Sequence, residues 1–158
     1  LLRNWNLSMC EVSDGSINIS HKKKCQYIKE LSTEFKVVSE VGSKDENVLI
    51  APYKWIELMQ KELESGSWKV IAEAREGGNV GIYRSGGDVR SDLIDEILTQ
   101  IPTDKILWEA PKKPQQVWFI KLLGPNVNLG NIAWDEVIPL ETLRIGLRGD
   151  TFFDYLSK

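Results

Sequence analysis

The chain has 158 residues, of which 42% are hydrophobic and 27% are charged, and its formal net charge is −3 at pH 7. This length and composition are typical of one globular domain with a real core, whereas the acidic balance argues against a nucleic-acid surface. No apolar run approaches the ~18 residues of a membrane span, and Cys10 and Cys25 lie far from any CxxC spacing, so we expect a cytoplasmic protein with reduced cysteines.

Predicted strands and helices alternate in the first half of the chain. A strand over residues 8–13 precedes a helix over residues 21–34, for which Ser20 is the expected N-cap. His21 has no ligand-like companion, and the lysines of this helix are expected to form a solvated face. These lysines are Lys22, Lys23, Lys24 and Lys29. A second strand over residues 35–41 precedes a helix that starts at Pro52, which suits a first helical turn, and ends at Gly66.

The second half continues the alternation. A third strand over residues 69–74 leads into a long loop with five glycines in eleven positions, at Gly77, Gly78, Gly81, Gly86 and Gly87. We expect this loop to be mobile and either to cradle an anion or to act as a lid, although it lacks the P-loop pattern. A helix over residues 89–100, a strand over 105–109, a helix from 114 to 124 and a strand over 126–129 follow. Helical pieces over 133–138 and from Pro139 to residue 147 close the pattern.

One short phrase recurs at the ends of the predicted strands. It reads KVVSE at 36–40, KVIAE at 69–73 and KILWE at 105–109, and a looser copy, LSMCE, ends at Glu11. The glutamates Glu11, Glu40, Glu73 and Glu109 are therefore 29, 33 and 36 residues apart, which is the size of a βαβ repeat. Parallel strands would carry all four to one rim of the sheet, so the sequence predicts a ring of carboxylates.

Converging carboxylates repel one another unless cations lie among them. Lys44 and Arg75 in the following loops are candidates, and a hard divalent ion such as Mg²⁺, which prefers oxygen ligands, is another. We expect Glu40, Glu73 and Glu109 to be the metal ligands. Alternatively, each glutamate merely accepts hydrogen bonds from neighbouring loop backbone. A functional rim is favoured for the set, because parallel α/β folds place their chemistry at the carboxyl ends of strands.

The strictly alternating order predicts an α/β fold with a parallel sheet and helices outside it. Five βα units are too few to close an eight-stranded barrel, which typically needs about 250 residues. The sequence therefore leaves two arrangements open: an open sheet, or a barrel whose first three units lie in front of this chain.

Five stretches, in order along the chain, resemble the phosphosulfolactate synthase family. They are EVSDGS (11–16), SEVGSKD (39–45), EAREGG (73–78), WEAPKKPQQVWFI (108–120) and GPNVNLGNIAWDEVIPLETLRIGLRGDTF (124–152). The resemblance implies a (β/α)8 TIM barrel, with residues 1–158 supplying about strands 4–8 of a single barrel domain. It also implies that the first three βα units of the family have no counterpart in this chain.

The family adds sulfite to phosphoenolpyruvate with Mg²⁺, giving (2R)-3-phosphosulfolactate, so the resemblance implies small-molecule substrates. Lys44 in GSKD matches the position of the family's proposed general acid; otherwise it is a surface loop lysine. Arg75 is the candidate to bind phosphate or sulfite, and its alternative role is an ion pair with Glu40 or Glu109. The full set of expected substrate-binding residues is Arg75, Ser13, Gln116, Asn128 and Asn131. Gly77 departs from the pattern, because a small hydroxyl residue is expected there.

Two other functions stay open on the sequence. One is a non-catalytic, protein-protective relative of the plant heat-stress-associated type, and the other is a different enolate-forming barrel lyase with another nucleophile. The presence together of Lys44, Glu73, Arg75 and Glu109 favours the enzyme, because a scaffold would not need them as a set. The oligomeric state is also open, a homo-oligomer included.

Overall fold

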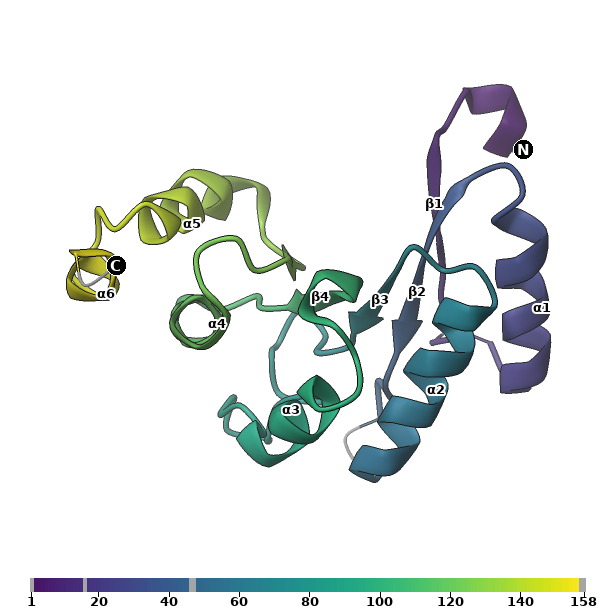
Figure 1. Cartoon of the computed structure of the whole chain (residues 1–158), viewed down its shortest axis with the longest axis horizontal. Helices are drawn as coiled ribbons and strands as arrows, with labels where there is room; N and C mark the ends of the chain where they lie inside the picture. The colour runs from purple at the N-terminus through teal and green to yellow at the C-terminus, as the bar shows by residue number, and fades with distance from the viewer. Residues whose placement is uncertain (1, 16, 46–47, 157–158) are drawn as a thin grey trace.

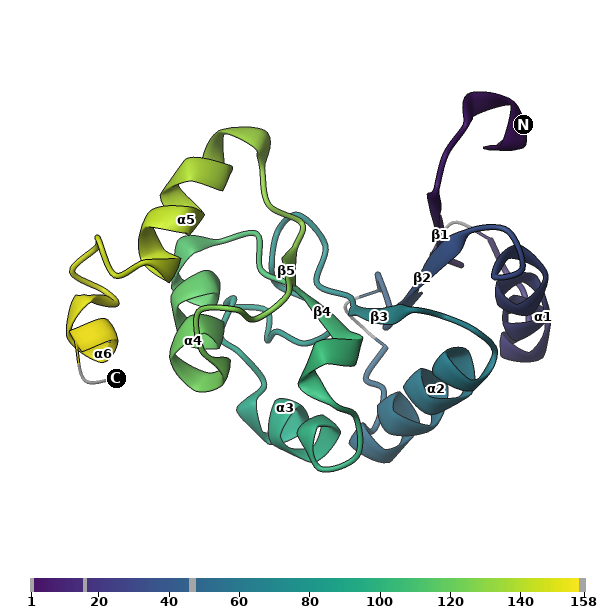
Figure 2. The ribbon, with the colours of Figure 1, turned by 45° about the horizontal axis from the view of Figure 1, so that its top comes forward.

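A computed structural model describes residues 2–15, 17–45 and 48–156. Its centre is one parallel sheet in which the five strands follow one another in sequence order, β1-β2-β3-β4-β5 (Figure 1 for the first four, Figure 2 for all five). The strands are β1 (Met9–Val12), β2 (Lys36–Val41), β3 (Lys69–Ala72), β4 (Ile106–Glu109) and β5 (Leu129–Gly130). The predicted α/β class and the parallel sheet are therefore confirmed.

Helices connect the strands, as the alternating pattern predicts. Figure 2 shows α1, α2 and α3 along one side of a curved row of strands, with the two chain ends at opposite extremes. The α-helices are α1 (His21–Leu31), α2 (Pro52–Glu64), α3 (Ser91–Leu98), α4 (Lys113–Leu123), α5 (Val137–Arg144) and α6 (Phe152–Leu156). Short 3-10 turns are η1 (Leu2–Trp5), η2 (Thr103–Lys105) and η3 (Trp134–Glu136). Among the described helices, none combines the length and the apolar character needed to cross a membrane.

Local sequence signals account for the first helix boundaries. The Ser20 hydroxyl accepts a hydrogen bond from the Lys23 amide, so Ser20 caps α1 as predicted. Pro52 occupies the first turn of α2, where its missing N–H costs nothing. Gly66 follows that helix with a φ of 113°, which favours glycine.

The main hydrophobic core lies between the sheet and the helices. Val70 and Ala72 of β3 face Trp55 and Met59 of α2 in this cluster, which continues through α3 and α4. The indole of Trp108 in β4 stacks on Phe119 of α4 with ring centroids 5.1 Å apart. Each fully buried apolar side chain contributes roughly 1.5–3 kcal/mol, so this packing fixes the helices against the strands.

The opposite face of the sheet carries the glutamates. Glu11 pairs in register with Val38, and Glu40 pairs with Ile71, so each glutamate lies two residues further along than the one on the preceding strand. The last register pair of β3 and β4 is Ala72 with Trp108, which brings Glu73 and Glu109 to the same level. The strands are therefore staggered, and their carboxyl ends form one slanting rim.

Two expected boundaries in the second half of the chain are wrong in detail, and one helix was not predicted. β5 covers Leu129–Gly130 rather than 126–129, because the chain is still turning at Val127, whose amide donates to the Gly124 carbonyl. α5 begins at Val137 instead of at Pro139, because a proline in the first turn lacks only a donor that has no helical partner. The five-residue helix α6 was not expected.

The glycine-rich loop is packed against the protein rather than extended from it. Ile82 and Tyr83 at its centre are buried, and Ile82 donates its amide proton to the Glu73 carbonyl. Gln115 of α4 donates from its side chain to the carbonyls of Gly78 and Gly87, at 2.9 and 3.1 Å. The buried apolar residues between the glycines and these hydrogen bonds therefore hold the loop against the protein.

Candidate active site

A cavity of about 700 Å³ lies at the carboxyl ends of β1 to β4. Its charged lining consists of five glutamates, one lysine and one arginine: Glu11, Glu40, Glu73, Glu76, Glu109, Lys44 and Arg75. The predicted rim of carboxylates is thus assembled by the fold. Because acidic groups outnumber basic ones here, the cavity favours a bound cation, and an anion would need such a cation beside it.

Lys44 lies among the carboxylates. Its ammonium nitrogen is 3.2 Å from Glu40 Oε2 and 3.5 Å from Glu73 Oε2, and its side chain is about one-third exposed. The lysine reaches this position from the loop after β2 by lying against Gly15, where an added Cβ would come within 2.7 Å of the lysine Cδ. The structure therefore places Lys44 in the cavity, in ion pairs with two carboxylates, and not on an open surface loop.

Each of three glutamates has one oxygen held by a short hydrogen bond. The Ser13 hydroxyl donates to Glu40 Oε1, the Arg75 amide donates to Glu73 Oε1, and the Ala74 amide donates to Glu109 Oε2, each at 2.7 Å. Two of these donors are loop backbone, so one oxygen of Glu73 and one of Glu109 accept the kind of hydrogen bond that the alternative expectation describes. That expectation does not describe the second oxygen of Glu73, which is buried and has no hydrogen-bond donor among the described residues.

The mutual proximity of the carboxyl groups changes their proton affinity. Burial, and after it the contact with the Glu40 carboxyl and the charge of Glu109, raise the pKa of Glu73 to about 7. Burial likewise raises the pKa of Glu109 and of Glu11. For Lys44, burial lowers the pKa, but the carboxylates of Glu40 and Glu73 outweigh it and the net change is upward. The lysine is therefore a protonated donor at neutral pH, and Glu73 can hold or release a proton there.

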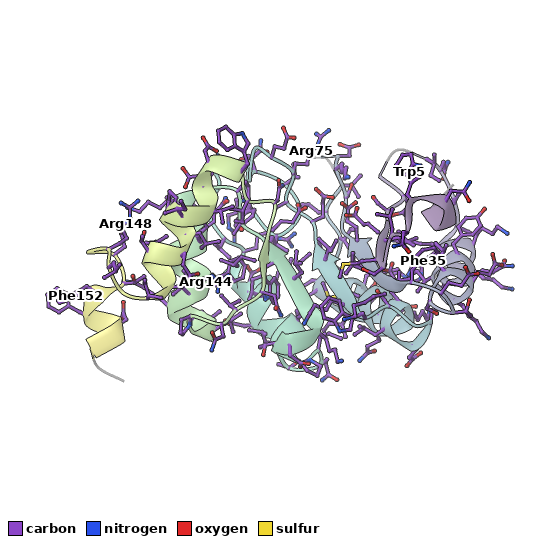
Figure 3. The ribbon with its side chains drawn as sticks, turned by 90° about the horizontal axis from the view of Figure 1, so that it is seen from above. Trp5, Phe35, Arg75, Arg144, Arg148 and Phe152 are labelled. Carbon is purple, nitrogen blue, oxygen red and sulfur yellow. The ribbon has the colours of Figure 1, made fainter. Side chains whose placement is uncertain are left out.

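Arg75 follows β3 on the same rim. Its φ of 58° is left-handed, and this turn lets its amide reach back to Glu73 while its side chain stays exposed. In the part of the chain that the structure describes, the guanidinium forms no ion pair, so the expected alternative of a pair with Glu40 or Glu109 is not observed. Figure 3 shows Arg75 well separated from Arg144 and Arg148.

The other expected binding residues divide into two groups. Asn131 lines the cavity, and its side chain partly offsets the rise that burial causes in the pKa of Glu109. Ser13 lies just behind the rim and holds Glu40. Gln116 is fully buried and donates to the Ala110 carbonyl, and Asn128 donates to the Ile106 carbonyl, next to a second cavity at the other end of the strands.

Neither Gln116 nor Asn128 lines the rim cavity, contrary to their expected position. Gln116 faces the core because it lies one position after Gln115, which turns toward the glycine-rich loop. Asn128 precedes the two-residue strand β5, so it lies two residues below the rim level at Gly130, which pairs with Glu109. The strand predicted over residues 126–129 begins three residues before β5, so the sequence pattern places Asn128 nearer to the rim than the structure does.

The sequence interpretation missed two cavity-lining residues, Glu76 and Asn79. Both lie in the glycine-rich loop, whose position over the rim was the available signal. Among the described residues, no group of three or more histidine, cysteine, aspartate or glutamate side chains is arranged to enclose a metal ion.

Residues 1–150 match the family model described as (2R)-phospho-3-sulfolactate synthase (ComA). The chain belongs to this family. It is 47% identical over 146 residues to a phosphosulfolactate synthase of Bacillus subtilis (strain 168), a match that covers 90% of this chain and 58% of that protein. It is 44% identical over 153 residues to the phosphosulfolactate synthase of Methanothermobacter thermautotrophicus, covering 94% and 59% respectively.

A more distant similarity connects the chain to a plant protein. Protein HEAT-STRESS-ASSOCIATED 32 of Arabidopsis thaliana is 29% identical over 82 residues, which is 52% of this chain and 27% of that protein. The chain thus spans somewhat less than two thirds of the two synthases described above, and a smaller part of the plant protein. Within the synthase family, the cavity at the carboxyl ends of the strands is the candidate active site.

Proposed function

We propose that the intact protein adds sulfite to phosphoenolpyruvate and forms (2R)-3-phosphosulfolactate. One observation carries the proposal: in a chain of this family, Lys44 lies in the rim cavity with its ammonium held by Glu40 and Glu73. A fixed and protonated donor beside several carboxylates suits a reaction that ends with delivery of a proton to carbon.

The barrel belongs to the same proposal. Residues 1–158 would supply about strands 4–8 of a (β/α)8 barrel in a single domain. The stagger of the strands supports this, because closing a barrel requires strands that tilt and shift in register. The coverage of 58% and 59% of the two relatives also supports it, since five of eight units is a similar fraction.

The chemistry requires one nucleophile, one electron sink and one acid. Sulfite sulfur attacks the methylene carbon of phosphoenolpyruvate, forming the carbon–sulfur bond, and the electrons of the carbon–carbon double bond move into the substrate carboxylate. Lys44 then delivers the ammonium proton to the adjacent carbon, which restores the carboxylate. Its two carboxylate contacts keep the ammonium group charged and fix its direction.

The donor set fits Mg²⁺, although it does not enclose it. Mg²⁺ is commonly held by one or two carboxylates and completed by water and substrate oxygens, so three protein ligands are not required. One or two of Glu40, Glu73 and Glu109 would hold it, and Glu73 Oε2 is the most suitable atom, because it lies 3.5 Å from the Lys44 ammonium and accepts no hydrogen bond from the described residues. When bound, Mg²⁺ would supply Lewis-acid stabilisation of the negative charge on the substrate carboxylate.

Arg75 and Asn131 are the residues we assign to the substrate anions. Arg75 has an exposed guanidinium at the edge of the cavity, and its fork of donors suits phosphate or sulfite. Asn131 offers a side-chain amide beside Glu109. Gln116 and Asn128 receive no role in substrate binding, and Ser13 acts by holding Glu40.

The test is an assay of the intact protein with phosphoenolpyruvate and sulfite, in Mg²⁺ and in EDTA. Formation of phosphosulfolactate that stops in EDTA and returns with added Mg²⁺ is the expected result. Unchanged turnover in EDTA would refute the metal role. Absence of product under every metal condition would refute the activity and favour a non-catalytic function.

A further inference from the structure

A second cluster of charged groups is buried behind the rim, between α1 and α2. Lys24 is 2% exposed and Glu62 is 1% exposed, and the Lys24 ammonium is 2.9 Å from Glu62 Oε1. His21 Nε2 approaches the same carboxylate oxygen at 3.1 Å. The prediction of a solvated face is therefore wrong for Lys24, and His21 does have a partner.

Lys24 also reaches beyond this pair to the candidate active site. Its ammonium donates a hydrogen bond to the backbone carbonyl of Glu40, and it contacts Asp14 Oδ1 at 3.1 Å. Asp14 directly follows Ser13, whose hydroxyl holds the Glu40 carboxylate. One buried cation thus fixes the main chain of Glu40 and the loop that holds the side chain of Glu40.

This arrangement differs from an ion pair that only compensates charge. A buried ammonium needs an acceptor for each of its three protons, and Glu62 supplies one of them. Apolar residues of similar volume in place of the buried pair would serve stability as well or better. The additional contacts of Lys24 all lead to one residue, Glu40, which holds the Lys44 ammonium 3.2 Å from its own Oε2. The two acceptors other than Glu62 are the Glu40 carbonyl and Asp14, so the contacts that complete the ammonium tie it to the candidate active site.

We propose that Lys24 is a positioning residue for the active site, acting through Glu40 and the Ser13–Asp14 segment to hold Lys44 in place. The expected effect on turnover rests on the proposed function, whereas the expected effect on the position of Glu40 and Lys44 rests on geometry alone. Glu62 is the buried counter-ion of Lys24, 2.9 Å from its ammonium. The lysine is thus a support of the active site that lies outside the cavity.

The test compares two variants of the intact protein. Lys24→Met removes the support and leaves Glu62 buried without a cation, so both stability and turnover should fall. Lys24→Met combined with Glu62→Leu removes both charges, so stability should recover. Turnover of the double variant should stay roughly 10- to 100-fold below the wild type, the usual effect of losing a residue that orients a site.

The double variant separates positioning from stability. If its stability and its kcat both return to wild-type values, Lys24 only compensates charge and the proposal is overturned. Lys23→Met is the matched control, because Lys23 is the exposed neighbour on the same helix and contacts only Gln26, the Tyr27 ring and the Ser20 cap in the described chain. That variant should keep wild-type turnover.

Hydrogen exchange gives a measurement that does not depend on activity. In the double variant, amides of residues 13–15 and 42–44 should exchange at least tenfold faster, while those of α3 and α4 keep their wild-type rates. Exchange rates at residues 13–15 and 42–44 that equal those of the wild type would overturn the proposal. A wild-type protein that forms no product would refute the proposed function, and the exchange result would still decide the role of Lys24.

A third variant covers the case in which both of the others fail to fold. Asp14→Asn keeps the buried Lys24–Glu62 pair and changes a side chain that is about one-third exposed. It should fold, accelerate exchange at residues 13–15 and lower kcat severalfold. Unchanged exchange and unchanged kcat in this variant would count against the proposal.

Discussion

Replacing Glu73 by glutamine should make the protein more stable at alkaline pH. Glutamine has the shape of a protonated glutamate but cannot ionise. Its carbonyl oxygen can still accept the Arg75 amide, as Glu73 Oε1 does at 2.7 Å. Its amide group would replace the buried Oε2, which lies 3.5 Å from the Lys44 ammonium but accepts no hydrogen bond from the described residues. The substitution therefore removes a charge that the fold does not fully satisfy.

The pKa of Glu73 sets the size of the pH-dependent change in the free energy of unfolding. Burial and the neighbouring carboxyl groups raise this pKa from 4.5 to about 7. Between these two values the folded protein holds a proton that the unfolded chain has lost, so the free energy of unfolding falls as the pH rises. Each pH unit between them is worth about 1.4 kcal/mol, which gives a total of about 3 kcal/mol above pH 7. Below pH 4.5 both states are protonated and this loss is absent.

Urea unfolding of the wild type and Glu73→Gln at pH 4.5, 6 and 8, in EDTA, measures the difference. The glutamine variant should match the wild type at pH 4.5 and exceed it by up to about 3 kcal/mol at pH 8. Glu76→Gln is the control, because Glu76 is exposed in the same cavity and should show no such trend. A Glu73→Gln variant that is less stable than the wild type at pH 8 would refute the reasoning, because it would mean that the ion pair with Lys44 outweighs burial.

Two further substitutions test the candidate active site and the glycine-rich loop beside it. Lys44→Ala should lower turnover by roughly 100-fold or more, the scale of a general acid, whereas Lys54→Ala, at an exposed ion pair on α2, should stay within about twofold; near-normal turnover of Lys44→Ala would remove it from the mechanism. Gly81→Ala should lower the free energy of unfolding by more than about 2 kcal/mol, because φ is +62° and the new Cβ would lie 1.9 Å from the Glu73 carbonyl oxygen. Gly149→Ala, with no neighbour within 4 Å, should change it by less than about 0.5 kcal/mol in the same denaturation assay; equal losses in the two variants would contradict the close approach.

Features that depend on local sequence could be predicted well. The Ser20 cap and the proline in the first turn of α2 act within one or two helical turns, so neighbouring residues determine them. The convergence of Glu40 and Glu73 also followed from local patterns, because a strand that ends on a glutamate and a parallel sheet are sufficient to bring them to one rim.

Features that depend on packing between distant segments could not be predicted. Lys24 looks like one of several surface lysines in sequence, and only the placement of Glu62, far along the chain, makes it buried. Asn128 was displaced from its expected position by an error of a few residues in one short strand. In a staggered sheet such an error moves a side chain from the rim to the opposite end, so binding residues were harder to predict than elements.

The glycine-rich loop links the cavity to the hydrophobic core. The Tyr83 hydroxyl donates to the Glu109 carbonyl at 2.6 Å, and Ile82 packs in the same cluster as Leu93 and Ile94 of α3. A segment anchored in this way cannot swing aside without exposing its own buried residues to water. The cavity wall is then as durable as the domain itself, so on heating the protein should lose its binding capacity together with its tertiary structure, in one transition and not in an earlier one.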